Sequence, residues 1–555
     1  MLSNTDRTTL HDPDAEASIT GAEATALAST ENSKSKSIGG RIARAAIVLM
    51  AGTILSRMLG LGREVVIADL FGAGADVDAF TIANHVATIV YDLLIAGTVS
   101  AALVPVFSEY AAEGKDRAEF GRIVSSILTV AAIFLFLAVA MLEVFAEPLV
   151  GFMGAGYNDE TRSLALVMTQ WVLPGVFFMG LSGVVMAVHY AMGRFVFPAF
   201  TSALFNASIM VSALVLANVL QVRSLVLGMV VGAFAMFAFQ TPGLRGVPLR
   251  PSLDWSHPAV RKIFKLYAPV GLSVVISSAA LIIDRNLASH TGVGTIAAMR
   301  FATTIIQFGL GLVSAAISLA ALPSLSQHFS RGDTEAYKRT LAAGLRLVTV
   351  LVLPAAAGLM ALAVPIVGLV FRHGAFTEAD QNLTVLALLF YAPGLPFSAI
   401  DQVLIFAFYS RRNTWTPVLV GIAAAGVYLT VAFSTVGTLG MVGLVIANSI
   451  QFMFHVAVTG TLLWRVLRRE GGLRGYDIGS TTLKASAAAV AMALVSYGVW
   501  HALEGMIRAD SALSEVLLLG VPALAGGALY LGIIWLMRLP ELTMITSKIQ
   551  SRLKR

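Results

Sequence analysis

A succession of long apolar runs, separated by short polar clusters, dominates the sequence from residue 45 onward. There are fourteen such runs, and each is close to or longer than the roughly 20 residues that a helix needs to cross a bilayer. They cover residues 45–70, 79–106, 123–145, 163–193, 197–219, 222–241, 266–289, 296–325, 347–371, 382–410, 416–436, 440–464, 485–505 and 513–537. The sequence therefore predicts an all-α polytopic membrane protein with fourteen transmembrane helices.

Two places in this pattern predict a local irregularity. Gly60 and Gly62 interrupt the first run, so we expect a broken helix there. A membrane helix tolerates such a break only where the freed backbone groups face protein or a watery cavity. Residues Gln221 to Ser224 are expected to separate the fifth helix from the sixth.

The amino-acid composition excludes an ordinary cytosolic enzyme. Charged residues make up only 13% of the chain, against roughly 25% in an average soluble protein. The absence of cysteine excludes disulfides and thiolate chemistry. The sequence also contains no Walker A motif, no Gly-x-Ser-x-Gly element and no His-Glu-x-x-His pair. We therefore expect a protein that is not an enzyme and that binds no metal and no cofactor.

The basic residues indicate the orientation in the membrane. If the N-terminus is inside, only eight of the 38 Lys and Arg residues fall outside the inner loops and the tails, namely Arg57, Arg63, Arg162, Arg223, Arg285, Arg300, Arg372 and Arg508. This excess of positive charge on the inner side predicts that both termini are cytoplasmic. Topology then explains the net charge of +6, and nucleic acid is not an expected partner.

The second part of the chain repeats the first at a nearly constant spacing. The segment VPVFSEY at 104–110 aligns with LPSLSQH at 322–328, Gly72 and Gly74 align with Gly292 and Gly294, and Pro174, Tyr190 and Pro198 recur as Pro393, Tyr409 and Pro417. Each repeat holds six helices, and an even number places both halves in the membrane with the same orientation. Two such halves around a central cleft form a transporter architecture.

The repeat divides the chain into five parts. We expect a disordered cytoplasmic tail at residues 1–44, a first lobe of six helices at 45–241, a pseudo-symmetric second lobe of six helices at 242–470, two further helices at 471–540, and a basic cytoplasmic tail at 541–555. Residues 1–44 contain no sustained apolar run, so no signal peptide is expected.

Two arginines of the first run are candidates for substrate binding. Ionisable residues within a membrane usually face a cavity or a partner, because a charge in lipid costs at least a few kcal/mol. The expected break between Arg57 and Arg63 would let both turn toward one cavity. Arginine suits an anionic headgroup, since its planar guanidinium binds phosphate oxygens in pairs. The alternatives are that Arg63 snorkels to the interface and that Arg57 forms an ion pair with Asp78 or Asp92.

Further polar residues accompany these arginines. Asp78 and Asp92 lie fourteen residues apart around the second run, which places them on one helix face with Asn84 between them in sequence. We interpret Asp78, Asn84 and Asp92, together with Ser56, as polar groups that line or gate the cavity. For Asp78 the alternative is a cap at the N-terminus of its own helix.

The second half contains fewer ionisable residues within its runs. Arg300 lies about one turn into its helix, where we expect it to face the cavity and to bind the diphosphate headgroup together with Arg57 and Arg63. Asp284 and Asp401 are candidates for coupling to an ion or a proton, with a satisfied polar contact as the alternative for Asp401. Arg285 directly follows Asp284, and adjacent opposite charges near an interface are interpreted here as structural.

Several segments resemble a known family. Ser56 to Ala79 (SRMLGLGREVVIADLFGAGADVDA), VPVFSEY at 104–110, LPSLS at 322–326, FRHGAFT at 371–377 and FYSRRNTWTP at 408–417 are similar, in this order, to segments of the MurJ/MviN lipid II flippases. These belong to the multidrug/oligosaccharidyl-lipid/polysaccharide exporter superfamily. The resemblance covers about residues 45–465.

This resemblance implies a role in peptidoglycan biosynthesis. The protein would move the undecaprenyl-diphosphate-linked disaccharide-pentapeptide precursor, lipid II, from the inner to the outer leaflet of a bacterial plasma (inner) membrane. It would do so by alternating access of two lobes, with the lipid tail in a groove formed by the two extra helices. On matched positions, the family's cavity arginines fall on Arg57 and Arg63, and its helix-2 aspartate falls on Asp78.

The chain departs from the family pattern in two places. Residues 87–97 read ATIVYDLLIAG, without the arginines and the glutamate common in the family's second helix. The arginine common in its eighth helix falls on Thr304, and Arg300 lies one turn earlier on the same helix face, from which it can supply the charge.

We therefore predict a monomeric lipid II flippase that works with the cell-wall synthesis machinery and is driven by the membrane potential or by coupled Na⁺ or H⁺. A flippase for another polyprenyl-linked oligosaccharide is one alternative. An ion-coupled exporter of cationic drugs is a second, but it needs an anionic cavity and the arginine pair argues against it. A scaffold that binds cell-wall lipids or proteins without transport is a third.

Overall fold

The computed structural model describes residues 44, 47–92, 102–111, 116–254, 257–507 and 511–539. The tails expected at residues 1–44 and 541–555 lie outside these ranges, apart from residue 44. The described residues form helices joined by turns and loops, and no strand occurs among them. The prediction of an all-α protein is confirmed for this part of the chain.

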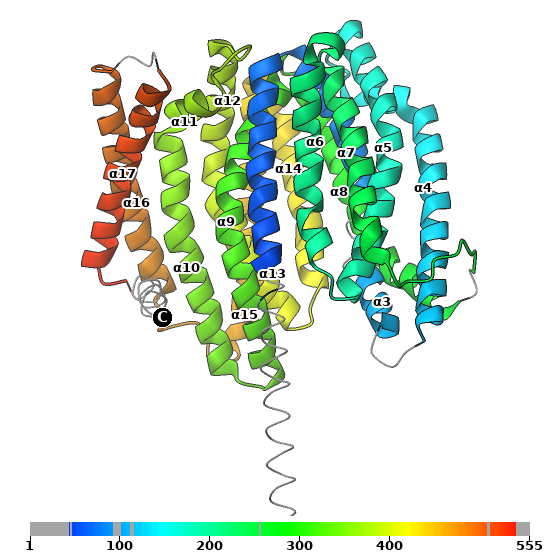
Figure 1. Ribbon diagram of the computed structural model, residues 1–555. Coiled ribbons are helices and arrows are strands. Elements are labelled where there is room, and N and C mark those ends of the chain that lie inside the picture. Colours follow the sequence, from blue (N-terminus) through cyan, green and yellow to red (C-terminus); the bar gives the residue numbers. More distant parts are fainter. Residues whose placement is uncertain are drawn as a thin grey trace, which may run out of the picture.

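The helices follow one another as the apolar runs predict (Figure 1). The first spans residues 47–71. It is followed by α2 (Ala75–Tyr91), α3 (Val104–Ala111), α4 (Arg117–Met153), α5 (Asp159–Ala191), α6 (Val196–Leu220), α7 (Arg223–Gln240), α8 (Pro258–Ser289), α9 (Thr295–Ser330), α10 (Thr334–Ala361), α11 (Ala363–Phe371), α12 (Glu378–Tyr391), α13 (Leu395–Ser410), α14 (Trp415–Leu439), α15 (Met441–Arg468), α16 (Ile478–Glu504) and α17 (Ala512–Leu536). Within the described ranges, ten helical stretches are long and apolar enough to cross a membrane.

The first helix runs without a break, so the predicted interruption at Gly60 and Gly62 is wrong. Gly52 of this helix lets α6 approach closely, because a Cβ atom there would lie 2.1 Å from the carbonyl oxygen of Ala199. A Cβ atom at Gly60 would lie 3.5 Å from the side-chain nitrogen of Asn206, which is an ordinary van der Waals distance. Small residues commonly serve close packing between membrane helices.

The internal repeat is visible in the order of the helix starts, which recur in the second half at nearly the spacing of the sequence repeat. The matching pairs are α2 and α9 at Ala75 and Thr295, α4 and α10 at Arg117 and Thr334, α5 and α12 at Asp159 and Glu378, α6 and α14 at Val196 and Trp415, and α7 and α15 at Arg223 and Met441. We call the first helix through α7 the first half, and α8 through α15 the second half.

The turns repeat as well as the helices. Gln221 separates α6 from α7 with φ 50° and ψ −139°, and Gly440 separates α14 from α15 with φ 56° and ψ −133°. These two residues are equivalent in the repeat, and the left-handed conformation persists although a glutamine occupies a place that favours glycine. The predicted separation of the fifth and sixth helices at Gln221 is confirmed.

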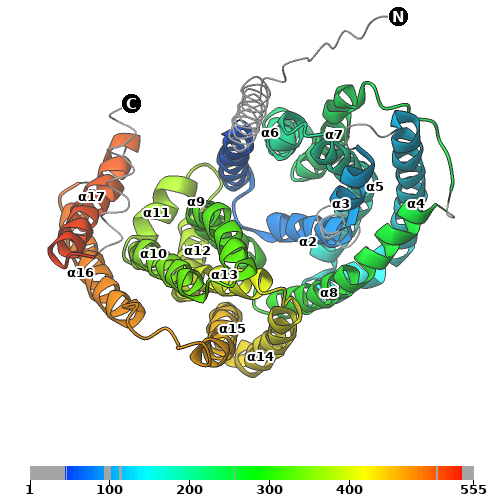
Figure 2. The same ribbon diagram turned by 90° about the horizontal axis from the view of Figure 1, so that it is seen from below.

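Each half packs mainly within itself (Figure 2). In the first half α5 contacts α2, α4 and α7, and α6 packs on α7; in the second half α9, α10, α13 and α15 form the corresponding group. The long helix α8 contacts α4 of the first half and α14 of the second. The pair α16 and α17 lies at the periphery, where it reaches the second half through α10 and α11.

The two halves meet in close backbone contacts at one end of the bundle, uppermost in Figure 1. The Ala375 amide donates to the Asp69 carbonyl at 2.7 Å, and the Gly156 amide donates to the Ser289 hydroxyl at 2.9 Å. A Cβ atom at Gly374 would lie 2.2 Å from the Asp69 carbonyl oxygen, and one at Gly156 would lie 2.4 Å from that of Ser289. These paired contacts, which we call the seam, are equivalent in the repeat.

Candidate functional site

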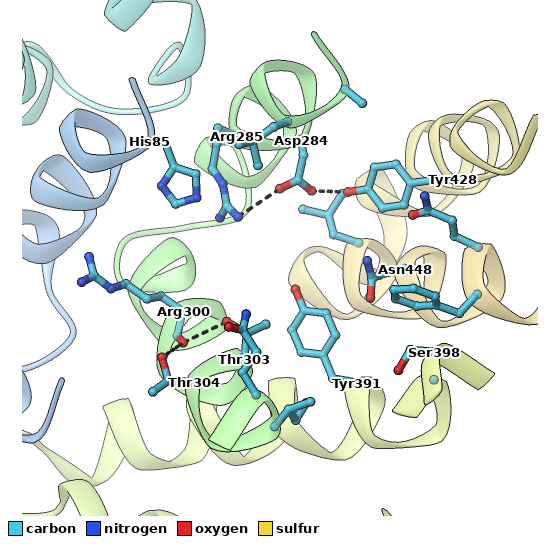
Figure 3. A pocket seen from close by; sticks show the side chains of 18 of the residues that line it. His85, Asp284, Arg285, Arg300, Thr303, Thr304, Tyr391, Ser398, Tyr428 and Asn448 are labelled. Atoms are coloured by element: carbon cyan, nitrogen blue, oxygen red, sulfur yellow. Dashed lines mark hydrogen bonds and ion pairs between the residues drawn. The ribbon is translucent and has the colours of Figure 1, made fainter. Parts of the chain in front are cut away.

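A cavity of about 620 Å³ lies where the two halves face each other. The first helix and α2 line it from one side, and α8, α9 and α12 to α15 line it from the other. Its polar lining residues are Arg63, Glu64, Asn84, His85, Asp284, Arg285, Arg300, Thr303, Thr304, Gln307, Tyr391, Ser398, Tyr428, Asn448 and Gln451 (Figure 3). The wall thus contains three arginines and two acids within an otherwise apolar bundle.

Glu64 is the buried centre of the charged wall, with a side chain that is only 1% exposed. Its Oε1 accepts hydrogen bonds from Nη2 of Arg63 at 2.5 Å and from Nη2 of Arg300 at 2.8 Å. Nε of Arg300 donates to Oε2 at 3.0 Å. One carboxylate therefore joins the first helix to α9, and pairing makes the burial of these charges tolerable.

Sequence reasoning singled out both arginines but missed Glu64. The available signal was its position directly after an arginine within an apolar run. An acid at such a place needs a cationic partner, because an unpaired carboxylate is too costly to bury.

The remaining nitrogen atoms of these two arginines also have partners. Nη1 of Arg63 donates to the side-chain oxygen of Asn206 in α6 at 2.9 Å. Nη1 of Arg300 lies 3.3 Å from the Thr81 hydroxyl, and its guanidinium lies 4.8 Å from the centre of the Phe80 ring, within cation–π range. Arg63 and Arg300 therefore belong to the cavity wall, and both are held firmly in it.

Arg57 lies outside this cavity wall. Because the first helix is continuous, Arg57 and Arg63 point about 120° apart around its axis. Nη1 of Arg57 donates to the Gln307 carbonyl of α9 at 2.7 Å, and its buried Nε has no partner in the described structure. The expectation that a break turns both arginines toward one cavity is wrong. The substrate-binding role of Arg57 stays a prediction.

Asp78 is fully buried at the junction of the two halves. Its carboxylate accepts hydrogen bonds from the Tyr157 hydroxyl at 2.9 Å, from the Gly294 amide at 2.6 Å and from the Ala297 amide at 2.8 Å. The alternative that Asp78 caps its own helix is wrong, because the N-cap of α2 is Gly74. Asp78 instead caps α9, where a carboxylate satisfies free amides and complements the helix dipole.

The other residues predicted to line or gate the cavity lie in different places. Asn84 lines the cavity. The Ser56 carbonyl accepts a hydrogen bond from the Asn206 side chain of α6 at 3.2 Å, and Asp92 forms the C-cap of α2. Ser56 and Asp92 do not belong to the described lining of the cavity.

Asp284 lies in the cavity wall on α8, between two partners (Figure 3). The Tyr428 hydroxyl of α14 donates a hydrogen bond to its carboxylate, and Nη2 of Arg285 lies 3.4 Å from its other oxygen. The described residues contain no cluster of three or more His, Asp or Glu side chains that could hold a metal ion.

Asp401 lies outside the cavity, within the second half. Its Oδ1 is 2.5 Å from Nδ1 of His455 in α15, and both residues are buried. Nε2 of the same imidazole lies 3.3 Å from the Pro417 carbonyl of α14. Sequence reasoning missed His455, because a lone histidine in an apolar run has no periodic partner and its acid lies far away in the chain.

Comparison with known proteins agrees with this architecture. The family described as Lipid II flippase MurJ matches residues 67–518. A probable lipid II flippase MurJ of Vibrio cholerae is 34% identical over 449 residues, which cover 78% of this chain and 84% of the relative. The lipid II flippase MurJ of Burkholderia cenocepacia is 28% identical over 515 residues, which cover 89% of this chain and 97% of the relative.

Solved structures share the fold. A lipid II flippase MurJ in an inward closed conformation superposes with a TM-score of 0.74 at 23% identity, over 88% of this chain and 98% of that chain. A multidrug resistance MATE family transporter in an inward-facing conformation superposes with a TM-score of 0.63 at 16% identity, over 79% of this chain and 98% of that chain.

A duplicated bundle of apolar helices around a charged internal cavity, with a fold shared by these solved structures, defines a multi-pass membrane protein. Within that class the chain belongs to the lipid II flippase MurJ family. The resemblance seen in the sequence segments is confirmed.

Proposed function

We propose that the protein moves lipid II from the inner to the outer leaflet of a bacterial plasma membrane. The observation that carries this proposal is the charged cavity enclosed between the two halves of an apolar bundle. A diphosphate-linked headgroup cannot cross hydrocarbon unaided, whereas its polyprenyl tail can remain there. Three arginines against two acids in the cavity wall favour an anionic substrate over a cationic drug.

The proposed topology has fourteen membrane-spanning segments, two lobes of six and both termini in the cytoplasm. Where the structure describes the apolar runs, one helix or two in series coincide with each of them, and the excess of basic residues on the inner side supports this orientation. The pair α16 and α17 exposes apolar side chains such as Leu483, Leu494 and Leu524, which suits a groove for the lipid tail. We propose a monomer that works beside the cell-wall synthesis machinery.

In this topology the seam lies at the outer end of the bundle and closes the cavity toward the outside. Release of a headgroup then requires the contact between Asp69 and Ala375 and the contact between Gly156 and Ser289 to break, while the inner end closes. Alternating access is therefore the proposed mechanism.

The proposed driving force is the membrane potential, or an ion coupled to it. One elementary charge moved across 100 mV contributes about 2.3 kcal/mol. The Asp401 and His455 pair offers a site for proton exchange, and the described groups that face the imidazole are the Asp401 carboxylate from α13 and the Pro417 carbonyl from α14. Asp284 in the cavity wall is the alternative acid.

The proposal is tested with purified protein in vesicles that contain fluorescent lipid II. We expect the label of the inner leaflet to become accessible to an external quencher only in vesicles that contain the protein. Release of a cationic dye without lipid II movement would indicate the drug exporter instead. Binding of lipid II, without movement of lipid II or of the dye, would indicate a scaffold that does not transport.

The same vesicles test the role of the seam. Because the chain has no cysteine, the double variant Asp69→Cys/Ala375→Cys creates a single pair across the seam. Oxidation should stop lipid II movement and reduction should restore it, with the two single variants as controls. Undiminished movement by fully cross-linked protein would contradict alternating access through this end.

A further inference from the structure

Arg285 stands out among the arginines of the cavity because its hydrogen-bonding capacity is largely unused. All three side-chain nitrogen atoms of Arg63 and all three of Arg300 have partners. Nε and Nη1 of Arg285 are buried and have no partner in the described structure. Its Nη2 has only the ion pair with Asp284, at 3.4 Å.

The acids near Arg285 are engaged by other donors. Asp284 accepts a hydrogen bond from the Tyr428 hydroxyl, and Asp78, which also attracts Arg285 electrostatically, already accepts three hydrogen bonds from other groups. His85 of α2 lies beside the guanidinium (Figure 3). Glu64 forms ion pairs with Arg63 and Arg300. A buried donor without an acceptor is costly, so two free nitrogen atoms on one guanidinium point to an acceptor supplied by a ligand.

We infer that Arg285 binds the diphosphate of the lipid-linked substrate from the second half. This inference rests on the proposed function and deepens it. The free Nε and Nη1 atoms belong to a planar guanidinium fork, which suits paired contacts with the oxygens of a phosphate group. Arg300 and Arg63 shape the charged wall around Glu64, and Arg285 is the cation in that wall that is free to contact the substrate directly.

The test measures binding of undecaprenyl diphosphate to purified full-length protein. Arg285→Gln should weaken binding about 10- to 100-fold, the effect of losing hydrogen bonds to a charged group. Arg285→Lys keeps the charge but loses the planar guanidinium fork, so its affinity should lie between that of Arg285→Gln and that of the unchanged protein. The matched control is Arg372→Gln, because Arg372 is an exposed arginine in the loop after α11, and its binding should equal that of the unchanged protein.

A second variant separates substrate binding from a structural ion pair. If Arg285 served only to neutralise Asp284, then Asp284→Asn would impair binding as much as Arg285→Gln. The inference predicts the opposite, since Asp284→Asn frees Nη2 as well and should bind the diphosphate at least as tightly. Equal losses in the two variants would overturn it.

The remaining outcomes are also decisive. Unchanged binding by Arg285→Gln overturns the inference and leaves the proposed function standing. A loss for lipid II but not for undecaprenyl diphosphate overturns the assignment to the diphosphate and points to a carboxylate of the peptide. An unchanged protein that binds neither probe overturns the proposed function itself.

Discussion

Glu64 and Asp284 occupy equivalent places in the two halves and are held in different ways. Their separation in the chain is the same as that between Gly72 and Gly292, which the sequence repeat aligns. Both line the cavity. Glu64 binds two arginines through four hydrogen bonds, whereas Asp284 has a tyrosine hydroxyl and one guanidinium nitrogen at 3.4 Å.

This difference separates two uses of charge in one cavity. In the first half the acid fixes its arginines, so they form a stable wall that also joins the halves. In the second half the acid leaves Arg285 largely free, so its guanidinium remains available to a ligand. Equivalent positions of a duplicated fold can therefore serve structure in one half and binding in the other.

A second pair of equivalent positions shows the same division. Ser182 and Asp401 are separated in the chain as Pro174 and Pro393 are, so the repeat aligns them. Ser182 accepts a hydrogen bond from Gln240 of α7 at 2.5 Å, whereas Asp401 contacts His455 of α15 at 2.5 Å. The first half shows that a neutral hydrogen bond is enough to join these helices. Since a buried ion pair gives little net stability, the proton exchange proposed above would account for an ionisable pair at this place.

The largest expected effect on stability is the difference in the free energy of unfolding between the variants Glu64→Gln and Asp284→Asn. Glu64→Gln leaves Arg63 and Arg300 buried beside each other without their counter-charge, so the free energy of unfolding should fall by about 3–5 kcal/mol. Asp284→Asn keeps an oxygen that accepts from the Tyr428 hydroxyl, so the free energy of unfolding should change by about 1 kcal/mol or less. Unfolding in mixed micelles measures both values. Equal destabilisation would show that the two acids have the same structural role.

An intermediate effect is expected within the second pair of positions. Asp401→Ala leaves Nδ1 of His455 buried without its partner and should destabilise the protein by about 2 kcal/mol. Ser182→Ala should destabilise the protein by about 1 kcal/mol or less, because the Gln240 side chain still donates a hydrogen bond to the Met236 carbonyl at 3.1 Å. The same unfolding measurement tests this difference. A larger loss for Ser182→Ala would contradict the view that the first half needs only a weak neutral contact.

Sequence patterns predict much of the fold for physical reasons. Apolar length is set by the bilayer, and the duplication preserves turns such as Gln221 and Gly440 even where residues differ. The break expected at Gly60 did not occur, because a glycine lowers the stability of a helix by only about 1 kcal/mol and so permits a break without requiring one. The close approach of α6 is at Gly52, where the sequence predicted no irregularity.

The candidate site could be predicted only in part. Composition and spacing identified Arg63, Asp284 and Arg300, which all lie in the cavity wall. The partners came from distant parts of the chain, as His455 does for Asp401, and no periodicity reveals such pairs. Arg285 was interpreted as structural because it follows Asp284, and only the 3.4 Å separation and the two unused nitrogen atoms show how weak that pairing is.

The smallest change in stability, and the sharpest test of the comparison, comes from giving the second half the contacts of the first. The repeat aligns Met236 with His455 and Gln240 with Thr459, so the triple variant Asp401→Ser/His455→Met/Thr459→Gln reproduces the neutral contact of the first half. Its free energy of unfolding should stay within about 1 kcal/mol of that of the unchanged protein, because one hydrogen bond replaces another.

Transport by this triple variant should lose its dependence on a proton gradient, because the only titratable side chains of the pair have been removed. The measurement is the rate of lipid II movement in vesicles, with and without a gradient across about pH 6 to 8, where an imidazole changes charge. Thr459→Gln alone is the control and should retain the gradient dependence. A stable triple variant that still responds fully to the gradient would assign coupling elsewhere, and Asp284, which lines the cavity itself, would then be the acid to test.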